Sequence, residues 1–227
     1  MADIYDRAAT IIRQIYDRRI ATPPVLDIES NFPNGRKFAL AWQAIREEAL
    51  AVSRRLREVP RFHEIMREQT AISANDGRDW RLFILKAYGI ENPRNMEACP
   101  VLASVVAAAP DVLSASISFM APNKHIPSHR GPFRGVLRFY LPLVMPKAVD
   151  GSPAAVLKID GSEYRLTDGQ CMLWDDTYSH EVWNRSDEVR IVLLLDVRRP
   201  NMPMDMALFS GILMTIVRWG IKFRGLS

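Results

Sequence analysis

The second half of the chain alternates between short apolar runs and turn residues, and this pattern restricts the fold more than any other feature. Runs rich in β-branched, aromatic and leucine side chains predict strands at 115–120, 135–144, 155–159, 163–166, 170–174 and 189–197. Asp-Gly pairs at 150–151, 160–161 and 168–169 predict tight turns between several of these strands. Short strands joined by short turns favour an antiparallel barrel.

The first half of the chain carries helical patterns instead. Apolar residues recur at helical spacing in three segments, at 2–20, 35–59 and 95–109. In the first segment, Ala8, Ile11, Ile12 and Ile15 fall on one stripe. We therefore predict a mainly β fold with helices packed outside the barrel.

The predicted strand at 135–144 has two chemically different faces. Strand alternation separates Val136, Arg138 and Tyr140 from the apolar face formed by Leu137, Phe139, Leu141 and Leu143. An arginine that faces a core is costly unless it is paired. The face of Arg138 is therefore either exposed to solvent or part of a polar barrel interior.

Composition predicts one principal domain. Hydrophobic residues make up 48% and charged residues 25% of the 227 residues, which is ordinary for a globular chain. Cys99 and Cys171 flank apolar sequence without a secretory signal, so we expect reduced thiols and a cytoplasmic location. The expected divisions are an amphipathic helix at 1–24, a domain at 25–205 with its barrel core at about 112–200, and an apolar helix at 206–227.

The C-terminal segment is apolar and basic. Residues 206–223 contain only Arg218 and Lys222 as charges, and an embedded arginine disfavours a bilayer span. The helix either docks on the barrel of this or a neighbouring subunit, or lies on a membrane with Trp219 and the cations Arg218, Lys222 and Arg224 near anionic headgroups. A net charge of +4 agrees with peripheral contact to an anionic membrane. We find no nucleic-acid-binding module, and the oligomeric state stays open.

Two histidines stand beside predicted strands in polar motifs. His129 lies in Ser-His-Arg-Gly-Pro, and His180 follows Asp175 and Asp176 by a few residues. Two imidazoles at strand ends can hold one Fe(II) and leave positions for substrate and dioxygen. Arg190 opens the next predicted strand, where its guanidinium could grip a dicarboxylate. The two aspartates either stabilise a turn or orient an iron-bound water.

These motifs together resemble the aspartyl/asparaginyl β-hydroxylase family of Fe(II)- and 2-oxoglutarate-dependent dioxygenases. The resemblance runs from about residue 32 to residue 200 and is greatest to bacterial lipid A and ornithine-lipid fatty-acyl hydroxylases. It rests on His-Arg-Gly-Pro at 129–132, Leu-Arg at 137–138, Asp-Asp at 175–176, His-Glu-Val-Trp-Asn at 180–184 and Arg190.

The resemblance implies a double-stranded β-helix and a set of site residues. It makes His129 and His180 the iron ligands and places Asp176 near the metal as a catalytic residue. It makes Ser118, Arg138, Tyr140 and Arg190 candidates for binding 2-oxoglutarate. Many related barrels have a carboxylate two residues after the first histidine, where this chain has Gly131. The family shares that departure, which suggests a two-histidine iron site.

Two positions bear on the substrate. Tyr140 stands where the peptide hydroxylases, and many of the lipid hydroxylases, have a histidine; its hydroxyl can still bind an oxygen atom, so we expect cosubstrate binding to be kept. Val136 stands where the peptide hydroxylases have an arginine for their acidic substrate. We therefore expect hydroxylation of an unactivated C–H bond in a lipid acyl chain. The alternatives are β-hydroxylation of a peptide Asp or Asn or of a free amino acid, and a non-catalytic metal-binding or membrane-associating module.

Overall fold

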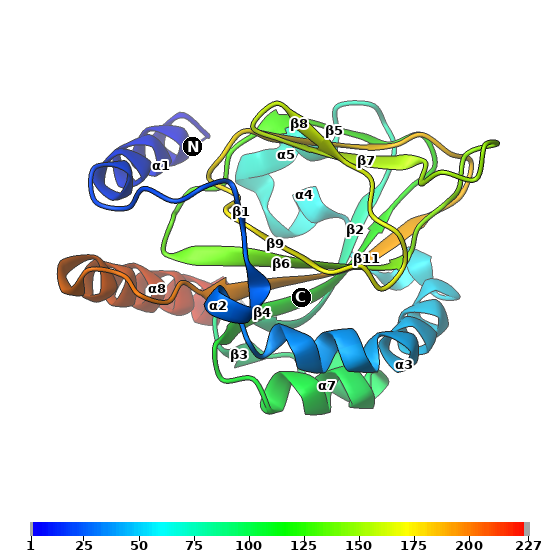
Figure 1. Cartoon of the computed structure of the whole chain (residues 1–227), viewed down its shortest axis with the longest axis horizontal. Helices are drawn as coiled ribbons and strands as arrows, with labels where there is room; N and C mark the ends of the chain where they lie inside the picture. The colour runs from blue at the N-terminus through cyan, green and yellow to red at the C-terminus, as the bar shows by residue number, and fades with distance from the viewer. Residues whose placement is uncertain (1, 225–227) are drawn as a thin grey trace.

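The computed structural model describes residues 2–224, with side chains described for residues 7–223. Residues 1 and 225–227, which belong to the expected terminal segments, lie outside it, as does the side chain of Arg224. Within the described chain, two antiparallel sheets face each other, one of seven strands in the order β1-β9-β6-β11-β4-β2-β3 and one of four in the order β5-β10-β7-β8 (Figure 1). The strands are β1 Val25–Leu26, β2 Trp80–Ala87, β3 Ile90–Glu91, β4 Val112–Met120, β5 His125–His129, β6 Val136–Val144, β7 Ala155–Ile159, β8 Ser162–Tyr164, β9 Met172–Trp174, β10 His180–Asn184 and β11 Arg190–Arg198.

The strands β4 to β11 form a double-stranded β-helix. In chain order they belong to the large, small, large, small, small, large, small and large sheet, so the chain crosses between the sheets at almost every step. Every pairing between them is antiparallel. The prediction of a jelly-roll or cupin-like barrel with flanking helices is confirmed.

Helices cover the apolar face of β6, as the alternation of apolar and polar side chains along this strand predicts. The helices α3 (Gly35–Ser53) and α7 (Pro100–Ala107) cover the outer face of the large sheet (Figure 1). Leu137, Phe139, Leu141 and Leu143 are fully buried in the core beneath these helices. The side chain of Arg138 therefore points into the space between the two sheets, which is the barrel interior.

Several boundaries differ from the sequence prediction for local reasons. The helix expected at 95–109 is two helices, α6 (Pro93–Ala98) and α7, because Pro100 cannot donate a backbone hydrogen bond to α6. The helix expected at 35–59 ends at Ser53 and is followed by the short 3-10 helix η1 (Leu56–Glu58). Strands β2, β5 and β10 were not predicted because charged and polar residues interrupt their apolar pattern. The remaining short helices are α2 Ile28–Asn31, α4 Phe62–Ile65, η2 Arg67–Gln69 and α5 Thr70–Ser73.

The two terminal helices, α1 (Ala2–Asp17) and α8 (Met204–Arg224), lie on the same side of the barrel (Figure 1). They share a small core in which Tyr16 contacts Phe133 and Phe209, and the Tyr16 hydroxyl is hydrogen-bonded to Ser210 at 2.5 Å. The buried stripe of α1 includes Ala9 and Tyr16. The expected apolar stripe is only partly a core face, because Ile12 packs against this core whereas Ile11 and Ile15 are exposed.

Candidate active site

The two predicted ligand histidines meet across neighbouring strands. His129 ends β5, His180 begins β10, and the two residues are direct partners in the antiparallel register. Their ring centroids lie 4.0 Å apart with the planes tilted by 57°. Strand pairing therefore places side by side two residues that are far apart in the sequence.

Both imidazoles are held in the same tautomer by the backbone. The Nδ1 atom of His129 donates to the Pro127 carbonyl at 2.7 Å, and that of His180 donates to the Tyr178 carbonyl at 3.0 Å. A carbonyl only accepts, so Nε2 of each ring keeps its lone pair. Burial lowers the pKa of His129, and burial together with the neighbouring His129 lowers the pKa of His180 well below its usual value. Both rings are therefore neutral near pH 7, the form that binds a metal.

Asp176 lies in the loop between β9 and β10, four residues before His180, and has an unsatisfied side-chain oxygen. The side chain is buried, and Oδ1 has no hydrogen-bond partner among the described residues. The other oxygen, Oδ2, lies 3.2 Å from Nη2 of Arg138. Burial raises the pKa of Asp176 to about 6, although Arg138 opposes this shift. A buried, unpartnered carboxylate oxygen is suited to accept a hydrogen bond from a bound molecule.

Gly131 leaves the space that Asp176 occupies. A Cβ atom at Gly131 would lie 2.2 Å from Oδ1 and 2.4 Å from Cγ of Asp176. The backbone N–H of Gly131 also donates to the Asp176 carbonyl at 2.6 Å. The carboxylate of Asp176 thus fills the place that a side chain at position 131 would need.

Arg138 is neutralised by carboxylates. Its Nη2 donates to Asp196 Oδ1 at 2.8 Å and lies near Asp176, and its Nε donates to the same Asp196 oxygen at 3.1 Å. Burial alone would lower the pKa of Arg138, but Asp196 and Asp176 raise it above its ordinary value. These contacts fix the orientation of the Asp176 carboxylate, and the assignment of Arg138 to 2-oxoglutarate binding stays a prediction.

Arg190 is the opposite case. The residue is 2% exposed, and no carboxylate forms an ion pair with it among residues 7–223. Its guanidinium donates to the Tyr140 hydroxyl at 3.2 Å and to the Ser118 hydroxyl at 3.3 Å, while Nε has no partner. Ser118 also accepts from Trp80 Nε1 at 3.0 Å. A buried, unpaired cation is costly, so this cluster is built to receive an anion.

The donor set permits a metal held by two histidines. Among the described side chains, no group of three or more His, Cys, Asp and Glu residues could hold a metal ion. Imidazole nitrogens suit Fe(II), and a metal bound by only two protein ligands keeps several positions for small ligands. The neutral rings of His129 and His180 and the free oxygen of Asp176 fit such a group.

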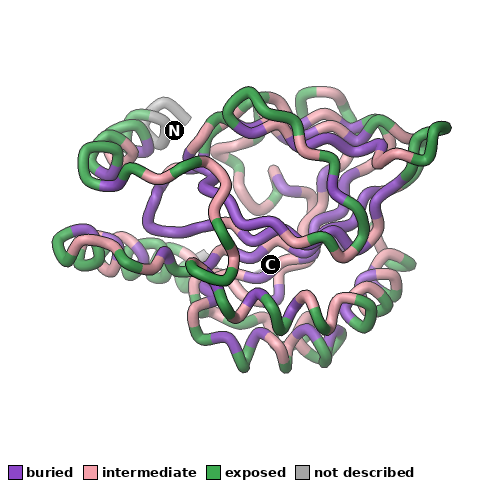
Figure 2. Tube along the Cα trace, viewed as in Figure 1, coloured by how far each residue is buried: buried purple, intermediate pink, exposed green. Residues whose placement is uncertain are grey.

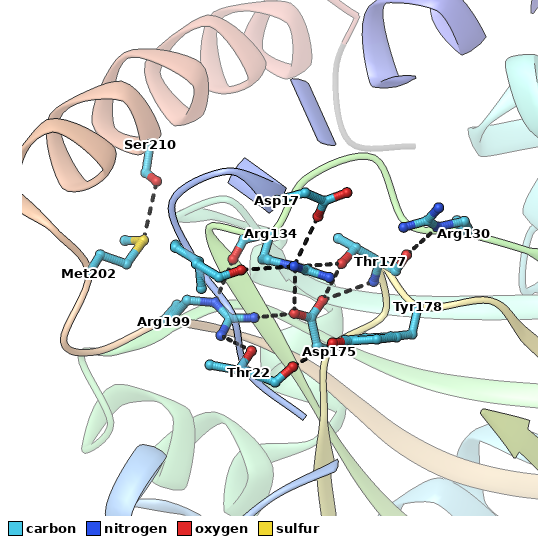
Figure 3. A network of polar contacts seen from close by, with 11 residues as sticks. Asp17, Thr22, Arg130, Arg134, Asp175, Thr177, Tyr178, Arg199, Met202 and Ser210 are labelled. Carbon is cyan, nitrogen blue, oxygen red and sulfur yellow. Dashed lines mark hydrogen bonds and ion pairs between the residues drawn. The ribbon is translucent and has the colours of Figure 1, made fainter. Parts of the chain in front are cut away.

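The loop that carries Asp176 and His180 is clamped by a buried ion network (Figure 3). Asp175 is fully buried and pairs with Arg134 at 3.0 Å and with Arg199. Its second oxygen accepts from the backbone and hydroxyl of Thr177 at 3.0 and 2.6 Å. Arg134 also pairs with Asp17 at the end of α1, at 2.9 Å. The network joins the loop to α1, to the start of β6 and to the end of β11.

Sequence reasoning missed several of these residues. Asp196 had a readable signal, because it follows Arg190 by six residues in one strand and therefore shares its face. Arg134 and Arg199 have no comparable signal in the sequence, because their partner Asp175 is distant from both along the chain. Trp174 also lies at the site, where it packs edge-on against His180 with 4.6 Å between ring centroids.

Comparison with known proteins identifies the family of this chain. The family model described as aspartyl/asparaginyl beta-hydroxylase matches residues 39–200. The ornithine lipid ester-linked acyl 2-hydroxylase of Rhizobium tropici is 35% identical over 182 residues, which is 80% of this chain. The human aspartyl/asparaginyl beta-hydroxylase is 26% identical over 168 residues, or 71% of this chain.

The chain spans only part of these relatives, 63% of the Rhizobium protein and 20% of the human protein. Among solved structures, a predicted oxalate decarboxylase from Thermotoga maritima matches 41% of this chain and 72% of its own, with 14% identity and a TM-score of 0.32. That score is too low to inform the site.

We predict that Gly131→Ala lowers the free energy of unfolding by about 1–3 kcal/mol, because the new methyl group overlaps a carboxylate that Arg138 holds in place. Denaturant unfolding measures the change. Gly211→Ala is the control, since its Cβ meets nothing within 4 Å and the helix should be slightly stabilised. Adding Asp176→Ala to Gly131→Ala should cost less than the sum of the single changes. Strict additivity would contradict the steric account.

We also predict that Asp175→Asn lowers the free energy of unfolding by about 3 kcal/mol, because it leaves Arg134 and Arg199 buried with reduced compensation. Asp205→Asn is the matched control and should change little, since the ion pair between Arg19 and Asp205 is exposed. Equal effects of the two variants would show that the network does not hold the loop.

Proposed function

The chain belongs to the aspartyl/asparaginyl β-hydroxylase family, and from this premise we propose that it is an Fe(II)- and 2-oxoglutarate-dependent dioxygenase that hydroxylates an unactivated C–H bond of a lipid acyl chain. His129 and His180 would hold the iron through their Nε2 atoms. When bound there, iron with dioxygen and 2-oxoglutarate supplies the oxidant for the C–H bond, and the cosubstrate leaves as succinate and carbon dioxide. A cytoplasmic location, where iron stays ferrous, belongs to the same proposal.

The observation that carries the proposal is the unpaired guanidinium of Arg190. A carboxylate beside it would receive charged hydrogen bonds from Arg190 and could accept from the hydroxyl of Tyr140, which itself accepts from Arg190. Tyr140 and Arg138 are two positions apart on β6 and therefore share one face of the strand. The anion site at Tyr140 thus lies about 7 Å along the strand from Arg138, which contacts Asp176. A short dicarboxylate has a length suited to reach from Arg190 toward the histidines.

Asp176 would orient what binds beside the histidines. Its free Oδ1 can accept a hydrogen bond, and Arg138 fixes the carboxylate through Oδ2. Asp196 in turn fixes Arg138. A water or substrate hydroxyl at Oδ1 would thereby be held in one direction.

The lipid substrate is consistent with the apolar character of the buried side chains between the two sheets. Next to the Arg190 cluster, Phe62 stacks on Trp80 with ring centroids 3.9 Å apart. Further apolar side chains of the same buried cluster line both sheets: Met120, Ile126, Leu157, Ile159, Met172 and Val182. Val136, which stands where the peptide hydroxylases have an arginine, is buried in the core that α1 and α8 share, so only the resemblance connects it with the substrate. The Rhizobium relative is named as a hydroxylase of a lipid acyl chain, and this name also supports the proposed substrate.

We predict that purified protein supplied with Fe(II) and 2-oxoglutarate adds one oxygen atom to an acyl lipid in a bacterial lipid extract and releases succinate. His129→Ala and His180→Ala should abolish both products, because each removes half of the protein ligands. His125→Ala is the matched control, since that imidazole bonds to Glu181 and stacks on Trp183 away from the pair. Mass spectrometry of the extract and of a peptide library measures the outcome. If oxygen is added to peptides and not to lipids, the substrate is a peptide. Turnover by His180→Ala would contradict the two-histidine site.

For Arg190→Ala we predict a rise of about 100-fold in the apparent KM for 2-oxoglutarate, equivalent to about 3 kcal/mol for a lost buried charged hydrogen-bond pair. Arg190→Lys should restore only part of this, because an ammonium lacks the planar fork. Arg198→Ala, an exposed arginine at the other end of β11, is the control. An unchanged KM in Arg190→Ala would move the cosubstrate carboxylate elsewhere.

A further inference from the structure

One face of α8 is an uncovered apolar stripe. Leu208, Ile212, Ile216, Trp219 and Phe223 recur at spacings of four, four, three and four residues, which places them on one side of the helix. Their exposed fractions range from 52% to 82%. Figure 2 shows the outer side of this helix as exposed. An unbroken apolar stripe of this length on a protein surface indicates a contact with something outside the barrel.

The opposite face of α8 attaches the helix to the rest of the fold. Met206, Ser210 and Met214 are buried against the core shared with α1. Among the described residues, α8 is the helix long and apolar enough to cross a membrane by length and composition alone, yet only 17% of that window is buried. The exposed stripe is therefore not needed to attach the helix to the barrel.

Cations flank the stripe, and acids are nearly absent from it. Lys222 is exposed beside it, and Arg218 is fixed at its edge by a 3.0 Å hydrogen bond from Nε to the Tyr88 carbonyl. Asp205 is the only acid of α8, and it is paired with Arg19 at 2.9 Å. An apolar stripe with tryptophan and flanking cations matches an anionic lipid surface in both polarity and charge.

The neighbouring helix α1 extends the same chemistry. Ile11 and Ile15 are exposed on it, Arg7 is exposed one turn before Ile11, and Arg18 is exposed directly after the helix ends. Arg13 of α1 donates to the carbonyl of Gly131 at 3.2 Å, so this helix touches the loop that follows His129. A membrane surface bound by α8 and α1 would thus lie beside the loop that follows His129.

We propose that the exposed stripe of α8, together with the adjoining face of α1, docks the protein on an anionic lipid bilayer, with α8 lying in the plane of the interface. The barrel contacts through Met206, Met214 and Arg218 keep the helix from crossing the bilayer while it is packed. The docking needs neither iron nor 2-oxoglutarate, because none of the site residues lies on α8.

A second copy of the chain is the less suitable occupant. If two α8 helices paired through this stripe, neither helix would offer a free carboxylate to Arg218 and Lys222 of the other, because Asp205, the only acid of α8, is paired with Arg19. A bilayer containing anionic headgroups instead gains about fivefold in affinity for each cation near its surface.

The test is co-sedimentation of the full chain with vesicles of phosphatidylcholine alone or with added phosphatidylglycerol, without iron or 2-oxoglutarate. The wild-type chain should bind the anionic vesicles and bind more weakly at high salt. Ile212→Glu with Ile216→Glu should weaken binding at least tenfold, and Lys222→Gln about fivefold. Leu40→Glu is the matched control, because Leu40 is 78% exposed on α3, away from the stripe, and should leave binding unchanged.

Circular dichroism melting establishes that each variant is folded, and light scattering gives the mass in solution. The double variant should retain succinate formation with a short soluble acyl substrate, so loss of vesicle binding and loss of catalysis are distinguishable. Wild-type binding to vesicles at the level of the double variant would overturn the proposal. A stable dimer that the double variant dissociates, without vesicle binding, would assign the stripe to a second copy.

Discussion

The buried carboxylate of Asp175 is the contact on which the site depends. It lies between the guanidiniums of Arg134 and Arg199, and these reach it from the loop before β6 and from the residue after β11. Through Arg134 the same network reaches α1. Because breaking a buried ion pair is far more costly than breaking an exposed one, the loop between β9 and β10 has little freedom. The adjacent residue, Asp176, and the first residue of β10, His180, inherit that rigidity.

Two arginines of the barrel interior, the partly buried Arg138 and the buried Arg190, show how the same side chain has different roles. Arg138 forms ion pairs with Asp176 and Asp196, so its charge is neutralised and helps to orient Asp176. Arg190 has two hydroxyl acceptors and no carboxylate, so its charge is available to a ligand. The difference follows from position: Asp196 is the register partner of Arg138, whereas Arg190 pairs with Met120 and Ile191 with Val144. An anion that binds beside Arg190 would neutralise the guanidinium charge, for which the fold supplies no carboxylate.

Much of the barrel could be predicted from alternation and turn residues, because β6 and β11 are long and strongly patterned. β5 and β10 could not, since Pro127, Ser128 and Glu181 break the pattern in the strands that bear the histidines. The candidate residues His129, His180 and Arg190 were recognisable as motifs, but their surroundings were not. The filling of the space beside Gly131 by Asp176 and the pairing of Arg138 with Asp196 arise from strand register and loop placement. The outward face of α1 was misassigned in part because Tyr16, a residue outside the expected stripe, forms its main core contact.

The central claim is that iron at the histidine pair and 2-oxoglutarate at Arg190 occupy one connected site. Anaerobic titration of Fe(II) into the protein, with and without 2-oxoglutarate, tests it most directly. The account predicts that 2-oxoglutarate tightens Fe(II) binding to the wild-type chain, and that Arg190→Ala binds Fe(II) alone normally but loses the tightening. Fe(II) affinity that does not respond to 2-oxoglutarate in the wild-type chain, or that survives unchanged in His180→Ala, would contradict it.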